Sequence, residues 1–221
     1  MHSIRAVVLD VDGTMIDSEK TLPDIWRNTL HALGHELPTL YAWYYKYGTA
    51  NRFDKTFAKM LKDFNFEMDF DTFLKEFVVQ RNKFYVHTPP SPKQGLFRLL
   101  DFCKAHNIPV AVCSSGWDIE VKLPKCGIPM TYFKTVVDGR MVVDPKPAPD
   151  CYLLACKKLG VEPQHALAIE DSDLGVAAAY NAGMRVILIP DRKANEPEAV
   201  KMAWHKLKSL DEAIPLIKEG L

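Results

Sequence analysis

The chain has 221 residues, of which 48% are hydrophobic and 25% are charged, so it can bury a sizeable core and its composition argues against disorder. Its 28 Lys and Arg residues balance its 28 Asp and Glu residues, and this net charge of zero gives no electrostatic basis for binding nucleic acid or an anionic membrane. The five cysteines include no Cys-x-x-Cys pair, and no apolar run approaches the ~20 residues of a membrane span. We therefore expect a cytoplasmic protein with reduced thiols and no signal peptide.

Residues 4–9 form a short apolar run rich in β-branched side chains, which predicts a buried strand. From about residue 22 to residue 86 the apolar residues recur instead with helical spacing. Leu22, Ile25, Trp26 and Leu30 would share one helical face, and the later aromatic residues repeat the pattern. This stretch predicts a block of several helices inserted just after the first strand.

Beyond this block the pattern alternates between strands and helices. Strands are expected at 108–113, 134–139, 166–170 and 185–190, and helices at 96–106, 150–159, 174–182 and 197–203. The sequence SLDE at 209–212 predicts a capping box that opens a last helix, which Pro215 would shorten or kink. Alternation of this kind is typical of a doubly wound, Rossmann-like parallel α/β sheet. We predict a core domain of residues 1–16 and 88–221, with a helical cap domain of residues 17–87.

Polar residues follow the predicted strands at the points where the strands end. They are Asp10 and Asp12 after the first strand, Ser114 and Ser115 after 108–113, Lys146 in a later loop, and Glu170 and Asp171 after 166–169. Ligands of open parallel sheets bind outside the carboxyl ends of the strands, so we expect these side chains to converge on one edge.

The chemistry of this set indicates a metal and a phosphate. Several carboxylates at one place stay ionised only if a cation holds them, and an all-oxygen ligand set favours Mg²⁺. Lys146 and the hydroxyl groups would then bind a phosphate, while Gly13 permits a tight turn whose N–H groups bind phosphate oxygens. Asp10 would attack phosphorus, and Asp12 would protonate the leaving oxygen and later activate water.

Four motifs in this order resemble those of the haloacid dehalogenase-like superfamily, and their spacing is similar to that of its β-phosphoglucomutase-like branch of phosphatases. They are the Asp-x-Asp-Gly-Thr run at residue 10, Ser114, Lys146 within KPAPD, and the Glu170-Asp171-Ser172 run. The similarity covers nearly the whole chain, and the helical block resembles the cap domain of that branch.

The resemblance implies a role for each matching residue. Asp10 matches the nucleophile and a Mg²⁺ ligand, and Asp12 matches the acid and base, with its backbone carbonyl also on Mg²⁺. Ser114 matches the phosphate-binding hydroxyl, and Lys146 the lysine that stabilises the transferring phosphoryl group. Asp171 matches a Mg²⁺ ligand, and Glu170 a second or outer one.

These features predict a Mg²⁺-dependent phosphatase that acts on a small phosphomonoester, such as a sugar or polyol phosphate. The alternatives are a sugar-phosphate mutase and a non-catalytic regulatory protein on the same fold. Leu22 stands where mutases of this branch carry a cap histidine, and Thr14 also favours hydrolysis. Pro145 replaces the usual glycine, which leaves the path of the lysine loop open.

The helical block would select the substrate. Arg52 matches a cap arginine that contacts the far end of the substrate, although a surface charge at a helix start would look the same. We expect a monomer or a weak homodimer, with no nucleic-acid or membrane partner.

Overall fold

The computed structural model describes residues 3–48, 53–192 and 194–221. The chain divides into two compact units, a larger unit of Met1–Asp17 with Ser91–Leu221, and a smaller unit of Ser18–Pro90. Within the described residues, no helix combines the length and the apolar character needed to cross a bilayer.

The larger unit is built on one sheet of six parallel strands in the order β3-β2-β1-β4-β5-β6. The strands are β1 (Ala6–Leu9), β2 (Val110–Cys113), β3 (Thr135–Val137), β4 (Ala166–Glu170), β5 (Arg185–Leu188) and β6 (His205–Lys206). The predicted doubly wound parallel sheet is thus confirmed. The edge strand β6 was not predicted, because two residues are too few to show a period.

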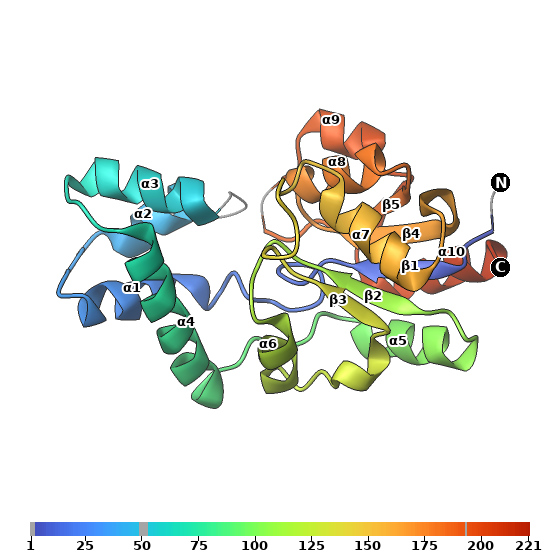
Figure 1. Cartoon of the computed structure of the whole chain (residues 1–221), viewed down its shortest axis with the longest axis horizontal. Helices are drawn as coiled ribbons and strands as arrows, with labels where there is room; N and C mark the ends of the chain where they lie inside the picture. The colour runs from blue at the N-terminus through green and yellow to red at the C-terminus, as the bar shows by residue number, and fades with distance from the viewer. Residues whose placement is uncertain (1–2, 49–52, 193) are drawn as a thin grey trace. The chain divides into compact units, whose positions relative to one another are not determined.

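Helices cover both faces of this sheet (Figure 1). They are α5 (Leu96–Ala105), α6 (Ile119–Lys125), α7 (Asp150–Leu159), α8 (Asp173–Asn181), α9 (Pro197–Met202) and α10 (Ala213–Glu219), with 3₁₀ turns at Met130–Tyr132, Pro163–His165 and Leu210–Glu212. Alternate strand residues face opposite sides. Ala6 and Val8 of β1 therefore pack with Tyr152 of α7 and Val176 of α8 in one buried cluster.

The predicted capping box at 209–212 is wrong. The Ser209 side chain makes no capping hydrogen bond, and Glu212 Oε2 accepts from the Lys208 N–H at 3.2 Å. Residues 210–212 form a 3₁₀ turn, and α10 begins only at Ala213. Pro215 then lies in the first turn of α10, where its missing N–H breaks no helical hydrogen bond.

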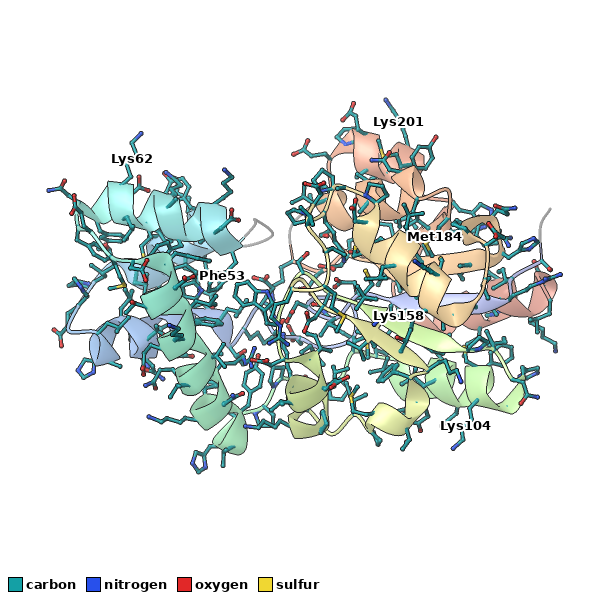
Figure 2. The ribbon with its side chains drawn as sticks, viewed as in Figure 1. Phe53, Lys62, Lys104, Lys158, Met184 and Lys201 are labelled. Atoms are coloured by element: carbon teal, nitrogen blue, oxygen red, sulfur yellow. The ribbon has the colours of Figure 1, made fainter. Side chains whose placement is uncertain are left out.

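In the smaller unit, residues 18–48 and 53–90 are described, and they form four helices: α1 (Leu22–Ala32), α2 (Leu40–Tyr47), α3 (Phe53–Phe64) and α4 (Phe70–His87). Trp26 is fully buried, and its ring centroid lies 4.8 Å from that of Phe73 and 5.2 Å from that of Phe53. Figure 2 shows Phe53 next to α4, whereas Lys62 points outward from α3. The apolar faces predicted from the helical spacing thus pack as an aromatic core.

Candidate active site

The site lies where the strand order reverses between β1 and β4, the switch point at which doubly wound sheets bind ligands. Asp10 follows β1 directly, and its N–H donates to the carbonyl of Ile169 in β4 at 3.1 Å. Glu170 ends β4. Neighbouring parallel strands therefore place two acids, 160 positions apart in the sequence, side by side at the carboxyl-terminal end of the sheet.

A tight turn after β1 brings residues 13 and 14 against Asp171. The N–H groups of Met15 and Ile16 donate to the carbonyl of Val11 at 2.9 and 3.0 Å. Gly13 has a φ of +91°, and a Cβ atom there would lie 2.1 Å from Asp171 Oδ2. Only glycine tolerates both this conformation and this close approach. The Thr14 hydroxyl then donates to Asp171 Oδ1 at 3.0 Å, which orients that carboxylate.

Lys146 lies at the centre of the site and is buried. Its Nζ donates to Asp10 Oδ1 at 2.7 Å, to Glu170 Oε1 at 2.5 Å and to the carbonyl of Cys113 at 3.2 Å. Burial alone would lower the pKa of this ammonium, but the charges of Asp10 and Glu170 outweigh burial and hold the pKa well above its usual range. Lys146 is therefore a fixed positive charge against Asp10.

Three acids, Asp10, Glu170 and Asp171, lie around the single positive charge of Lys146. Ligand oxygens of Asp10, Glu170 and Asp171 all lie within 4.8 Å of one another. Burial, and then the charge of Glu170, raise the pKa of Asp10 from 3.8 to about 8. Burial and the charges of Asp10 and Glu170 likewise raise the pKa of Asp171 well above its usual range. Lys146 alone therefore cannot keep the three carboxylates ionised, and their all-oxygen donors suit a hard divalent cation.

Glu170 is the most tightly held of these acids. Its Oε1 accepts from Lys146 and from the Tyr152 hydroxyl at 2.7 Å, and its Oε2 accepts from the N–H groups of Asp171 and Ser172 at 3.2 and 3.4 Å. Because both oxygens already accept hydrogen bonds from the protein, Glu170 fits an outer position around a cation better than a direct ligand position.

Asp12 has a different environment from Asp10. Its side chain is 31% exposed, and Oδ1 forms an ion pair with Lys122 of α6. A Cβ atom at Gly116 would lie 3.6 Å from Asp12 Oδ2 and 3.3 Å from Ser114 Oγ, so the turn after β2 lies against this carboxylate. One aspartate is thus buried and fixed, while the other reaches solvent, and these two environments suit the two carboxylates to different chemical roles.

Among the described residues, the structure brings together all the predicted site residues except Ser115. Ser114 is buried and accepts from the N–H of Gly116 at 3.0 Å, whereas Ser115 is exposed and its carbonyl packs against Gly139. Arg52 lies outside the described residues.

Two residues of the site were missed by sequence reasoning. Tyr152, on the buried face of α7, gave no signal, since tyrosine is common in cores. Lys122 did give one, because it falls on the apolar face of α6 with Ile119 and Leu123, where an unpaired charge is costly.

Comparison with known proteins gives one matching family. A model of the haloacid dehalogenase-like hydrolases matches residues 4–183. Protein CbbY of Rhodobacter capsulatus is 29% identical over 217 residues, which cover 91% of this chain and 92% of that protein. A probable pseudouridine-5′-phosphatase of Drosophila melanogaster is 27% identical over 223 residues, which cover 97% of this chain and 94% of that protein.

A solved structure has the same fold. The crystal structure of CbbY from Rhodobacter sphaeroides in complex with phosphate has a TM-score of 0.80 and 25% sequence identity, with coverage of 95% of this chain and 96% of that chain. The family resemblance seen in the four motifs is therefore confirmed.

Proposed function

The chain belongs to the haloacid dehalogenase-like hydrolase family, and from that premise we propose that it is a Mg²⁺-dependent phosphatase of a small phosphomonoester, with Asp10 as the nucleophile. One observation carries the proposal: a buried Asp10 is paired with Lys146 beside two further acids, at the ligand-binding switch point of the sheet. The names of the relatives support the class of reaction, because one is a probable pseudouridine-5′-phosphatase and a related structure holds phosphate.

In this proposal Mg²⁺ would be held by the carboxylates of Asp10 and Asp171 and by the backbone carbonyl of Asp12, with Glu170 in an outer position. The raised pKa values of Asp10 and Asp171, which show that these acids do not stay ionised without a cation, and the oxygen donors of the cluster support this assignment. When bound, the cation neutralises the acids so that a phosphate dianion can approach them.

The protein's own residues then carry two displacements. Asp10 attacks phosphorus, the bond to the leaving oxygen breaks, and Asp12 gives that oxygen a proton. Asp12, now a carboxylate, takes a proton from the water that attacks the phosphorylated Asp10, and inorganic phosphate leaves. Lys146, Ser114 and the N–H groups near Gly13 bind the phosphate oxygens throughout.

The smaller unit is proposed to be the specificity domain, selecting a sugar or polyol phosphate and excluding water during the first displacement. Arg52 is the candidate contact to the far end of the substrate. A monomer or weak dimer in the cytoplasm stays a prediction.

Rapid-quench labelling tests the central step. After milliseconds with a phosphomonoester labelled at phosphorus, the wild type should carry label that hydroxylamine releases, as an acyl phosphate does, and Asp10→Asn should carry none. Phosphate release without any labelled protein would refute the covalent step. Product analysis separates the two enzyme classes, since a mutase returns an isomerised sugar phosphate instead of free phosphate.

A further inference from the structure

A second lysine enters the site from a helix that belongs to none of the four motifs. Lys122 lies on α6, its side chain is 6% exposed, and its ammonium is paired with Asp12 Oδ1. Asp12 is the carboxylate to which the proposed function gives both proton transfers. Each of the two aspartates after β1 therefore has a lysine of its own, Lys146 for Asp10 and Lys122 for Asp12.

Packing alone does not account for this lysine. Ile119, Leu123 and Cys126 are buried at positions i, i+4 and i+7 of the same helical face, and Lys122 occupies the i+3 position between them. A lysine in such a place costs free energy unless its charge is paired. A leucine would fill the face without that cost, so the observed lysine points to a role for its charge.

The helix is placed so that Lys122 reaches Asp12. Asp118 precedes α6 in a left-handed conformation, with φ 55°, and its carbonyl accepts from the N–H of Lys122 at 2.9 Å. This turn follows β2 through Ser114 and Gly116, so the phosphate-binding loop and Lys122 are parts of one short segment. Lys122 of that segment pairs with Asp12 Oδ1, and a Cβ atom at Gly116 would lie 3.6 Å from Asp12 Oδ2.

The geometry points to Lys122 as the positioning residue of Asp12. Because the Lys122 ammonium binds Oδ1 of Asp12, the proton is exchanged at Oδ2. When Asp12 is protonated, its carbonyl oxygen accepts from Lys122 and its O–H donates to the leaving oxygen. When Asp12 is a carboxylate, the same hydrogen bond remains and Oδ2 accepts the proton from water. Lys122 keeps its own proton in both steps. This inference rests on the proposed function.

Leaving groups that differ in their need for a proton provide the test. p-Nitrophenolate departs as a stable anion, whereas the alkoxide of a sugar or polyol requires protonation as it leaves. The kcat/KM value reports only the steps up to departure of the leaving group, so it isolates the acid step. It should be measured for p-nitrophenyl phosphate and for the sugar or polyol phosphate that the wild type hydrolyses fastest.

Lys122→Met should lower kcat/KM for the alkyl phosphate by about 100-fold, the cost of a displaced general acid, and for p-nitrophenyl phosphate by less than about threefold. Lys122→Arg, which retains the charge, should recover most of the alkyl activity. Lys104→Met is the matched control, because Lys104 is an exposed lysine on α5 of the same unit (Figure 2) and should leave both values unchanged. Thermal melts check that each variant is folded; should Lys122→Met fail to fold, Lys122→Gln replaces it.

Equal losses on both substrates, or no loss on the alkyl phosphate, would overturn the positioning role. Failure of the proposed function looks different, because the wild type itself would then release phosphate from neither substrate. A Lys122→Met effect that persists undiminished in an Asp12→Ala background would also contradict the inference, since positioning requires the group that is positioned.

Discussion

Replacing Asp10 by asparagine should stabilise the metal-free protein while it abolishes the activity. Burial and the neighbouring Glu170 raise the pKa of Asp10 from 3.8 to about 8, so folding without a cation disfavours its charge. At low pH the Asp10 carboxyl is neutral in both the folded and the unfolded state, so it does not lower the stability of the folded protein. As the pH rises from about 4 to about 8, the unfolded chain ionises first, and the folded protein loses stability.

The magnitude follows from the shift. At ~1.4 kcal/mol per tenfold change, raising the pKa from 3.8 to about 8 costs the folded state up to ~6 kcal/mol above pH 8. Asparagine removes this cost, but it accepts a weaker hydrogen bond from Lys146. The weaker bond reduces the gain in stability by ~1–2 kcal/mol. Asp10→Asn should therefore raise the free energy of unfolding by about 4 kcal/mol at pH 9 in EDTA, and by little near pH 4.

Urea unfolding followed by circular dichroism, at several pH values with EDTA or with Mg²⁺, measures this difference. Mg²⁺ should stabilise the wild type strongly and Asp10→Asn only weakly, because the variant lacks one of the carboxylates that bind it. Asp144→Asn, the same change at an exposed carboxylate, serves as the control. A variant no more stable than the wild type at pH 9 in EDTA would refute the view that burial, with repulsion from Glu170, makes ionised Asp10 destabilising in the metal-free protein.

Other changes around the cluster have separate signatures. Lys146→Met should lower kcat by at least about 100-fold, because Asp10 and the transferring phosphoryl group lose their fixed positive charge, and phosphate release measures it. Gly175→Ala should lower the free energy of unfolding, because the Cβ atom of the alanine would lie 1.9 Å from the buried Glu170 Oε1. Overpacking of this kind costs ~1–3 kcal/mol, which outweighs the ~1 kcal/mol that alanine gains in helix propensity. Urea midpoints at or above wild type would contradict that clash. Tyr152→Phe should cost ~1–2 kcal/mol through the lost hydrogen bond to Glu170 with kcat nearly unchanged, and a large fall in kcat would instead place the hydroxyl in the chemistry.

The sequence predicted the convergence of the acids because the rule behind it is general. Strand β1 and the first four residues of strand β4 are apolar, and parallel strands that end together bring the residues at their ends together. Asp10 and Asp171 could therefore be placed at one edge before any coordinates were known. The wrong capping box and the missed strand β6 are short features, which depend on contacts rather than on a repeating pattern.

The pairing of Lys122 with Asp12 lay beyond this kind of reasoning. It depends on where α6 packs and on the turn set by Asp118, a non-glycine residue with positive φ. Position 175 is a similar case, because glycine is required there by the close approach of the Glu170 carboxylate at the end of β4. A charged residue on an apolar helical face was the one sequence signal of Lys122, and it identifies the residue without naming its partner.

The central claim is that this chain hydrolyses a phosphomonoester through Asp10 with the help of Mg²⁺. Phosphate release from a panel of sugar and polyol phosphates, with and without Mg²⁺, on the wild type and on Asp10→Asn, tests it most directly. We predict release by the wild type that requires Mg²⁺ and is lost in the variant. Release that survives Asp10→Asn, or that is unaffected by removal of Mg²⁺, would contradict the account.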